Sequence, residues 1–510
     1  MLSKKIHLSE AKELYKHLKS KQKVSETLCE KYGVKYNETI GRYVRSWLTD
    51  KEKTSDTFKE AQKRKIDKSK FYLVTSAQNA TPINKSLLQN MEAYAEFLNA
   101  SIVCIPIRYK NPTSVFSDLK EEYWNQDIEK YLVARRDKVH KYLTILGDLK
   151  TQPTAAMPLT GIEGLTGLES SIIGHPRQHL KTMPVLEGYP SKVLMSTGSI
   201  TLSNYTDSKI GKKSDFHHTY GFIVIEVRDE ETFHIRHVSA SKNGEFYDLD
   251  YFVSKGEVQK DSEAVDTLVL GDVHVGSVCD DSIKATYKML ERFNPKNVVL
   301  HDLADGYSIS HHDAHNPFVL LEKERDNKNS IENELEECLK FLKPLVKYNP
   351  IVIRSNHNDF FDRWLMNTDW RKENNKYAYL KYAKLRADGF LDKGILAWEI
   401  QEKFGDNIKC LDSNKSFRIK GIEVSQHGDL GANGSRGSAN QFKTLNTKII
   451  TAHSHTPMKI DGFSSVGTLT NLRLSYNKGL SNWLNSNIII HKNGKNQNLL
   501  IIKGKFTSIK

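Results

Sequence analysis

The sequence predicts an α/β protein built from several regions. From Ala264 onward, short apolar runs typical of buried strands alternate with stretches of helical periodicity. Between Phe71 and about Glu263, strand-like and helix-like segments are mixed, whereas the first 50 residues show helical patterns only. A chain of 510 residues is long enough for about two to four domains. We therefore expect four regions: a helix-turn-helix at 1–50, a charged linker at 51–70, a mixed α/β domain of unknown role at 71–263, and a further α/β domain at 264–510.

The first region has the outline of a helix-turn-helix. An amphipathic helix is expected over 8–20, followed by a shorter helix, a turn at Gly33 and a second helix whose apolar face includes Val44 and Trp47. The exposed side of this hairpin would contact DNA through four polar residues: Lys35, Asn37, Arg42 and Arg45. A small helical bundle used for packing or self-association explains the same pattern, so both interpretations stay open.

Positive charge is concentrated at the start of the chain. The whole chain carries a formal net charge of +13, and residues 1–70 hold 19 Lys and Arg against 10 Asp and Glu. A basic segment of this kind favours a polyanionic partner, and DNA is the partner we expect. A solubilising tail is the alternative. Residues 51–70 hold few apolar side chains, which predicts a flexible or helical tether.

The middle region shows strand-like runs and no catalytic motif. The runs are FYLVTSA, ASIVCIPIRY, KVLMSTGSI, GFIVIEV and FHIRHVS, and a helix is expected around 86–99. The Gly-rich run 161–175 lacks the Lys-Ser/Thr pair of a phosphate-binding loop, so we interpret it as a connecting loop. Four histidines lack a metal-ligand spacing: His217, His218, His234 and His237. Six basic residues would either line a nucleic-acid channel or lie on solvated surface: Arg108, Lys110, Arg135, Arg136, Arg177 and Lys181.

The last region predicts strands alternating with helices. Strands are expected at 265–270, 297–300 and 350–354, with helices near 281–293 and 329–343. Helical stretches are expected within 376–404, and hairpin-like strands at 416–419 and 422–426, with Gly421 at the turn. The closing strands are expected near 449–452, 458–467 and 485–503.

Five short polar segments follow apolar runs of this region. They are Gly271-Asp272-Val273-His274, His301-Asp302-Leu303-Ala304-Asp305, Ser355-Asn356-His357-Asn358-Asp359, Gln426-His427-Gly428 and Ala452-His453-Ser454-His455. Side chains at the carboxyl ends of neighbouring strands meet at one edge of a sheet, so we expect these segments to converge. Carboxylate and amide oxygens mixed with imidazoles suit divalent metals such as Mn, Fe or Zn. Two such ions can clamp the attacking and the leaving oxygen of a phosphate ester.

The order of these segments resembles the calcineurin-like metallophosphoesterase superfamily, whose pattern runs D-x-H, G-D-x-x-D, G-N-H-D/E, a lone His and G-H-x-H. The resemblance covers about half of the chain, from Ala264 onward. Three positions depart from the pattern: His301 and Ala452 replace glycines, and Ser355-Asn356-His357-Asn358 replaces Gly-Asn-His-Asp/Glu. Every metal-ligand residue type is retained. The resemblance implies a two-sheet αββα sandwich with the metals at one edge, and it implies that the closing strands belong to the second sheet.

The resemblance also implies a role for each residue. Asp272, His274 and His455 would bind one metal ion, Asn356, His427 and His453 the second, and Asp302 both. His357 would act on the phosphate or the leaving oxygen, and Asp305 would act from outside the ligand set. The two ions would be Mn, with Fe, Zn or Mg as alternatives, and a metal-bound water or hydroxide would attack the phosphodiester.

Two loops near these segments hold further candidates. Residues 428–438, GDLGANGSRGS, follow His427, and their glycines allow close backbone approach to a ligand. Arg436 in this loop would bind a substrate phosphate, or the loop would be a simple connection. The histidines within 311–315 would line a substrate groove, although none occupies a ligand position of the superfamily pattern.

We therefore expect a two-metal-dependent nuclease that acts on DNA, similar to phage-encoded DNA-degradation nucleases of the superfamily and, more distantly, to repair nucleases of the SbcD type. A phosphatase or small-molecule phosphodiesterase is the first alternative, and a DNA-binding regulatory or packaging protein with a silent site is the second. The five widely spaced cysteines, without C-x-x-C, indicate a reducing cytoplasm, that of the host if the protein is viral. No apolar run approaches the ~18 residues of a membrane span. A homo-oligomer is compatible with the sequence.

Overall fold

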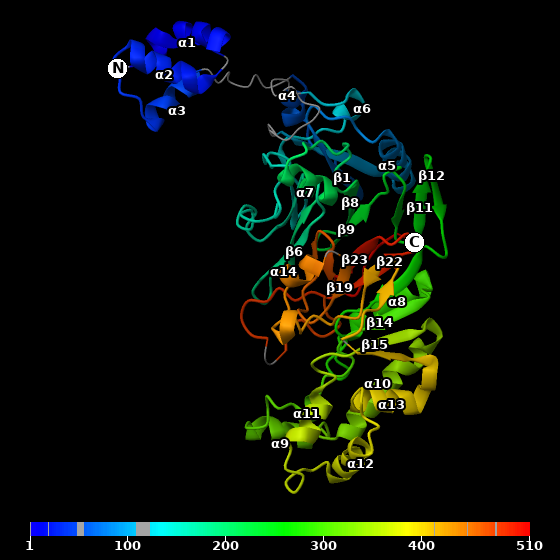
Figure 1. Cartoon of the computed structure of the whole chain (residues 1–510). Helices are drawn as coiled ribbons and strands as arrows, with labels where there is room; N and C mark the ends of the chain where they lie inside the picture. Colours follow the sequence, from blue (N-terminus) through cyan, green and yellow to red (C-terminus); the bar gives the residue numbers. More distant parts are fainter. Residues whose placement is uncertain are drawn as a thin grey trace. The chain divides into compact units, whose positions relative to one another are not determined.

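The computed structural model describes the chain except for residues 1, 19, 48–55, 109–122, 413, 446, 475–476 and 510. The chain divides into two compact units, Met1–Lys59 and Glu60–Lys510, and each is described by itself (Figure 1). The described residues contain no helix that is both long and apolar enough to cross a bilayer.

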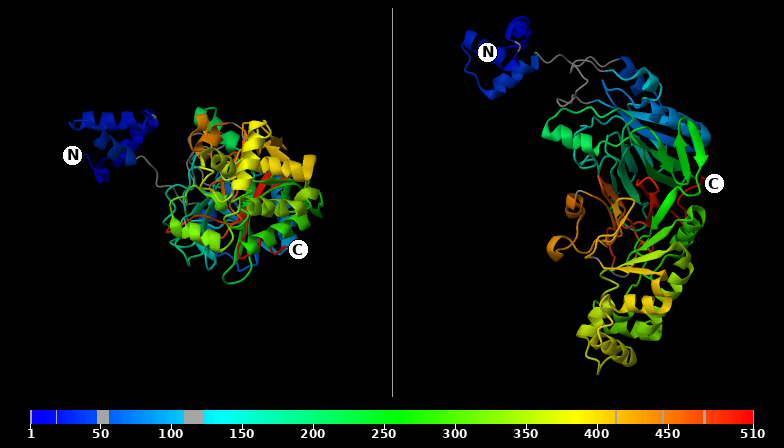
Figure 2. Two further views of the ribbon diagram at one scale, coloured as in Figure 1. Left: turned by 90° about the horizontal axis from the view of Figure 1, so that it is seen from below. Right: turned by 45° about the vertical axis from the view of Figure 1, so that its right-hand side comes forward.

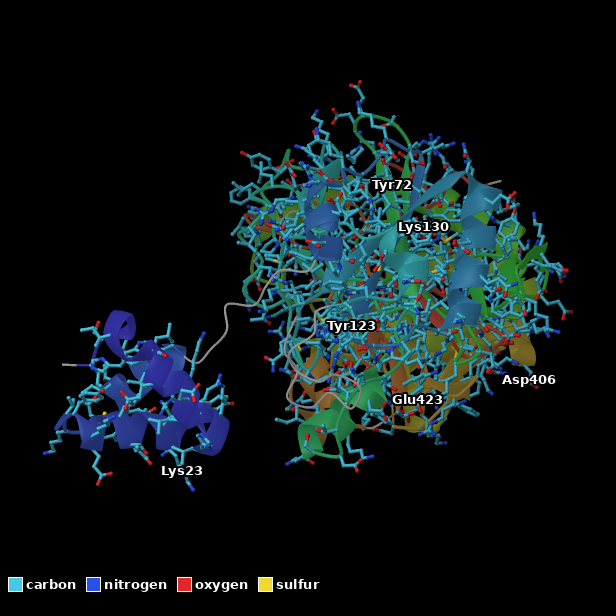
Figure 3. The ribbon with its side chains drawn as sticks, turned by 90° about the horizontal axis from the view of Figure 1, so that it is seen from above. Lys23, Tyr72, Tyr123, Lys130, Asp406 and Glu423 are labelled. Carbon is cyan, nitrogen blue, oxygen red and sulfur yellow. The ribbon has the colours of Figure 1, made fainter. Side chains whose placement is uncertain are left out.

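The N-terminal unit is a small helical bundle with its own core. It consists of α1 (Lys4–Leu18), α2 (Lys21–Lys31) and α3 (Glu38–Trp47). Buried Val24, Leu28, Val44 and Trp47 form the centre of this core. Gly33 takes a φ of 61° after α2, a left-handed conformation that glycine adopts without steric cost. Basic side chains such as that of Lys23 stay exposed around the core (Figure 3). A further helix, α4 (Asp56–Lys63), lies within the expected linker.

The larger unit begins with a four-stranded sheet of order β2-β1-β8-β9. Its strands are β1 (Phe71–Gln78), β2 (Ala100–Ile107), β8 (Gly221–Val227) and β9 (Phe233–Ser239). The helices of the same region are α5 (Lys85–Leu98), α6 (Gln126–Glu129) and α7 (Lys209–His217). A small antiparallel sheet follows, formed by β10 (Phe246–Asp248), β11 (Tyr251–Ser254) and β12 (Glu257–Lys260).

A ten-stranded sheet joins the two expected α/β regions. The earlier region supplies β3 (Arg136–His140), β4 (Leu143–Leu146), β5 (Ser170–Ile173), β6 (Leu180–Met183) and β7 (Lys192–Ser196). The later one supplies β17 (Arg418–Ile419), β18 (Ile422–Glu423), β19 (Lys448–Thr451), β20 (Met458–Ile460) and β21 (Phe463–Ser465). β6 pairs antiparallel with β20, with Lys181 opposite Met458. The boundary drawn at 263/264 therefore lies inside one compact unit.

A six-stranded sheet of order β16-β15-β14-β13-β22-β23 carries three of the five polar segments. Its strands are β13 (Val265–Val269), β14 (Asn297–Leu300), β15 (Pro350–Ile353), β16 (Lys409–Leu411), β22 (Ser486–His491) and β23 (Asn496–Leu500). The first four run parallel, whereas β22 runs antiparallel to β13. The expectation that strands within 485–503 belong to the second sheet is therefore wrong, because β22 bonds directly to β13 and β23 to β22.

Apolar residues fix how these layers pack. Val269, Ile353, Ile422 and Ile450 belong to one buried cluster, which lies between the six-stranded sheet and part of the ten-stranded sheet. A larger cluster lies on the other face of the six-stranded sheet, under helices that Figures 1 and 2 show in green to yellow. These helices are α8 (Asp280–Phe293), α10 (Ile331–Leu342), α11 (Phe360–Asn367), α12 (Lys376–Ala387) and α13 (Ile395–Phe404). Two further helices, α9 (Pro317–Arg325) and the short α14 (Ala439–Phe442), contribute no residue to this cluster. The mixed α/β class predicted from the sequence is confirmed.

Candidate metal centre

The five polar segments converge at the carboxyl ends of strands from two sheets. Asp272 and His274 follow β13, and the loops after β14 and β15 bring Asp302 and Asn356 alongside them. His427 follows β18, while His453 and His455 follow β19 of the other sheet. The loops are tied by backbone hydrogen bonds, such as that from His274 N to Asp302 O at 2.7 Å. Parallel strands end at the same edge, which is why residues far apart in sequence meet here.

One group of side chains gathers around His274 and His455. Their Nε2 atoms lie 3.1 Å apart. The Oδ2 atom of Asp272 lies 3.4 Å from His455 Nε2, and the Oδ2 atom of Asp302 lies 3.5 Å from His274 Nε2. All four residues are buried. Two imidazole nitrogens that face each other among carboxylate oxygens present several lone pairs toward one point, which is the environment a cation requires.

A second group gathers around Asn356. Its Oδ1 atom lies 3.0 Å from His427 Nε2 and 3.1 Å from His453 Nδ1. His427 Nε2 also lies 3.2 Å from Oδ2 of Asp302. The same carboxylate oxygen of Asp302 therefore faces both groups. The structure thus brings the seven predicted ligands together in two groups, with Asp302 facing both, and their role as metal ligands stays a prediction.

Burial of the ionised carboxylates of Asp272 and Asp302 is energetically unfavourable unless nearby positive charge compensates them. Both carboxylate oxygens of Asp272 and of Asp302 lack a hydrogen-bond partner that meets ordinary geometry within the described residues. Burial, together with the neighbouring Asp302, raises the pKa of Asp272 to about 7. Burial alone would lower the pKa of His427, but the Asp302 and Asp272 carboxylates outweigh it and raise that pKa to about 9. Unpartnered buried oxygens beside imidazole nitrogens fit a pair of divalent ions, which would satisfy both kinds of ligand.

The backbone at this edge is strained at four of the predicted ligands. His274, Asp302, His453 and His455 have φ values of 49°, 40°, 66° and 55°. Residues other than glycine rarely adopt this left-handed region, and each instance costs on the order of 1–3 kcal/mol. Such strain persists where surrounding structure holds it and is concentrated at functional sites. The conformations are therefore a further reason to treat this edge as the candidate functional site.

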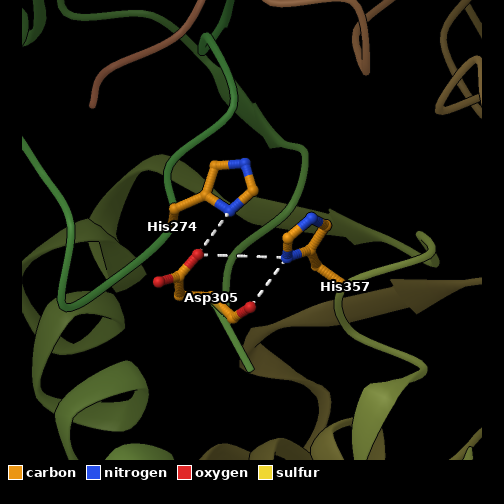
Figure 4. Close-up of side chains that lie close together, drawn as sticks. All are labelled: His274, Asp305 and His357. Atoms are coloured by element: carbon orange, nitrogen blue, oxygen red, sulfur yellow. Dashed lines mark hydrogen bonds and ion pairs between the residues drawn. The ribbon is translucent and has the colours of Figure 1, made fainter. Parts of the chain in front are cut away.

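Asp305 links two of the site histidines (Figure 4). Its Oδ1 atom lies 3.1 Å from His274 Nδ1, and its backbone oxygen lies 2.7 Å from His357 Nδ1. Because a carbonyl oxygen only accepts, His357 Nδ1 donates to it. Asp305 also accepts from Ser277 Oγ at 2.8 Å. The carboxylate thereby orients His274 so that Nε2 faces Asp302 and His455, as partners outside a ligand set do in metal sites. His274, Asp305 and His357 could themselves hold a cation.

Three aromatic residues at the site were not predicted from the sequence. The ring of Phe360 stacks on His357 with centroids 4.6 Å apart, and Trp483 meets His455 edge-on at 4.1 Å. The ring of His301 lies 5.7 Å from that of His427. His301 is fully buried, neither of its ring nitrogens has a partner among the described residues, and burial lowers its pKa to about 3. The replacement of the usual glycine by His301 was the only sequence signal for any of them.

The remaining predicted residues belong to the loop after His427 and to the N-terminal unit. Arg436 is exposed, and its backbone bridges to Leu430 within the loop after His427. In the N-terminal unit, Asn37 Oδ1 accepts from Ile40 N at 2.9 Å and so caps α3. Arg45 is half-buried and pairs with Glu38, whereas Lys35 is exposed. The side chain of Arg42 lies outside the described residues.

Comparison with known proteins finds a phage relative. The chain is 27% identical to Protein A1 of Escherichia phage T5 over 464 residues, which cover 86% of this chain and 83% of that protein. No protein-family model matches the chain. No solved structure matches it. The similarity is consistent with the phage character inferred from the sequence, and the superfamily resemblance stays a prediction.

Proposed function

We propose that the chain is a two-metal-dependent phosphodiesterase that acts on DNA. The observation that carries the proposal is the sharing of Asp302 Oδ2 between two sets of imidazole, amide and carboxylate ligands. Two divalent ions held there would activate water and stabilise charge on the phosphate. The order of the five polar segments, which resembles that of the metallophosphoesterase superfamily, supports this function.

The chain's own residues would position the phosphate and its leaving oxygen. His357 uses Nδ1 to donate to the Asp305 carbonyl, so its Nε2 is the ring nitrogen free to contact substrate. Phe360 stacks on this ring and restricts its rotation. His357 would donate a hydrogen bond or a proton to an oxygen of the phosphate ester. Asp305 would keep His274 in the tautomer that presents Nε2 to the centre.

Incubation with DNA tests this function directly. The full-length chain should degrade linear duplex DNA when Mn²⁺ is present, and EDTA should abolish the reaction. Circular duplex DNA in a parallel reaction distinguishes internal cleavage from digestion that starts at an end, through product sizing. An aryl phosphate monoester and a small aryl phosphodiester serve as further substrates. If the chain hydrolyses the monoester rapidly and leaves DNA intact, the function is that of a phosphatase and not of a nuclease. Full activity in EDTA would exclude a metal-dependent site.

Deletion of residues 1–59 should weaken DNA binding without removing hydrolysis. The removed unit is compact in itself and carries exposed basic side chains such as Lys35, and the remaining unit contains the entire metal centre. Each lost phosphate contact should reduce the slope of log affinity against log salt by about 0.9. The slope is measured by fluorescence anisotropy with a labelled duplex, and hydrolysis of a small aryl phosphodiester is the control. An unchanged affinity and slope would assign the unit to packing or self-association.

A further inference from the structure

A cavity of about 510 Å³ lies among residues of α7, the β19–β21 region and the turn between β22 and β23. It is separate from the metal centre. Lys448, which lines the cavity, is the first residue of β19, whereas His453 follows the end of that strand. At about 3.3 Å per residue, the three steps from Lys448 to Thr451 span about 10 Å along the strand, and His453 lies two residues beyond its end. The volume is within the range of cavities that enclose small-molecule ligands.

The lining of this cavity is strongly basic. Six Lys or Arg side chains line it, and Asp461 is the one carboxylate among its lining residues. Asp461 is already engaged on one side, because Arg177 Nη1 lies 3.0 Å and His179 Nε2 lies 3.2 Å from its Oδ1 atom. His217 Nδ1 approaches the same oxygen at 3.5 Å. Arg177 is 2% exposed, so it does not lie on solvated surface, which was the alternative to a nucleic-acid channel in the sequence analysis. Asp461 is therefore occupied by these three groups and compensates little of the positive charge of the cavity's lysines.

Lys459 is a buried lysine that lines this cavity. Its side chain is 7% exposed, and the described residues offer its ammonium group no hydrogen bond or ion pair. Burial and the nearby Lys495 and Lys448 lower the pKa of Lys459 to about 7. Lys448 Nζ donates to Gly494 O at 2.8 Å, which fixes it at the rim. A buried ammonium without a counter-ion is unfavourable, and an anionic ligand is what would compensate it.

An aromatic ring completes the site. Phe216 on α7 lines the cavity and is 73% exposed, and its ring meets that of His217 edge-on with centroids 4.9 Å apart. Exposed aromatic rings beside basic groups bind nucleobases by stacking. We propose that this cavity binds a nucleotide-sized, phosphate-bearing ligand, with its phosphate on Lys448, Lys459 and Lys495 and its base against Phe216. Free nucleotides and the phosphorylated end of a single strand share this chemistry.

Titration calorimetry on the full-length chain tests the site. The probes are dAMP, deoxyadenosine, inorganic phosphate and a short 5′-phosphorylated single strand, with Mn²⁺ present and again in EDTA. We expect dAMP to bind more tightly than phosphate, and deoxyadenosine to bind weakly. Lys459→Met should weaken dAMP binding by about 10- to 100-fold, because the loss of one hydrogen bond to a charged group reduces affinity by about this factor. Whichever of dAMP and the single strand binds more tightly identifies the source of the nucleotide, and either result supports the site.

Matched variants separate this cavity from the metal centre. Phe216→Ala should weaken dAMP binding and leave phosphate binding unchanged. Lys403→Met, at an exposed lysine of α13, should change neither. Asp302→Asn should retain dAMP binding in EDTA, because Asp302 belongs to the other site.

Lys459→Met removes an unpaired buried charge, so we expect this variant to fold. Lys495→Met changes a second lysine of the same cavity and tests the site independently. Three results would overturn the proposal: no dAMP binding by the wild type, wild-type dAMP affinity in both Lys459→Met and Lys495→Met, or dAMP binding that is lost only in Asp302→Asn.

Discussion

Asp302→Asn should yield a folded protein that hydrolyses no phosphodiester at a measurable rate. The carboxylate oxygen Oδ2 of Asp302 lies 3.2 Å from His427 Nε2 and 3.5 Å from His274 Nε2, so one substitution removes negative charge from both ligand sets. Metal ions stabilise charge in the transition state by several kcal/mol, and each 1.36 kcal/mol is a tenfold change in rate. We therefore expect a loss of at least about a thousandfold in the rate of DNA hydrolysis.

Metal analysis shows whether this loss has the proposed cause. Elemental analysis should find less bound Mn in Asp302→Asn than in the wild type, while circular dichroism finds the same secondary structure. Asp406→Asn, at an exposed aspartate labelled in Figure 3, is the matched control and should retain metal and activity. An Asp302→Asn protein with full metal content and wild-type rate would contradict the assignment of Asp302 as the shared ligand.

His357→Ala should lose activity by a factor of about 100 or more and keep its metal ions. His357 lies next to the predicted ligand Asn356, yet its Nδ1 is used by the Asp305 carbonyl and its ring packs on Phe360. A positioned acid or base contributes about 10²–10⁴-fold to a rate. Rates are compared on small phosphodiesters with good and poor leaving groups. If His357 donates a proton, the ester with the more acidic leaving group should lose less, because it needs no proton.

The alternative role of His357 as a ligand gives a different result. His274, Asp305 and His357 lie close enough to hold a cation together. Loss of metal from His357→Ala would make His357 a ligand, and equal rate losses on both esters would favour electrostatic stabilisation over proton donation. Phe390→Ala, at an exposed ring, is the control for nonspecific effects of removing an aromatic side chain and should leave both metal content and rate unchanged.

Local patterns in the sequence predicted much of the fold around the candidate site. The expected helix near 281–293 corresponds to α8 at Asp280–Phe293, and the strand expected at 297–300 is β14 with the same bounds. Apolar periodicity fixes such elements because it reflects burial of one face. The convergence of the polar segments was also predictable, since parallel strands place their carboxyl ends together.

Long-range pairing was not predictable from the same patterns. Periodicity shows that 486–491 is a buried strand, but it does not show that β13 is its neighbour. The contact of Trp483 with His455 likewise depends on how the chain returns to the site. Asp302 and His453 have left-handed backbone conformations, which these residue types rarely adopt. Residue propensities therefore could not predict these conformations. The basic cavity unites residues such as Arg177 and Lys495 that are far apart in sequence.

The pairing of β6 with β20 limits how this protein can be rearranged by recombination. A gene fusion that joined residues 264–510 to an unrelated partner would leave β20 with an unpaired edge, since Met458 and Lys459 bond to β6. Exposed edges of this kind pair with other chains and promote aggregation. Residues 264–510 are therefore not expected to fold on their own after such a transfer, and a viable exchange would have to carry residues 60–263 with them. The N-terminal unit has its own core and carries no such constraint.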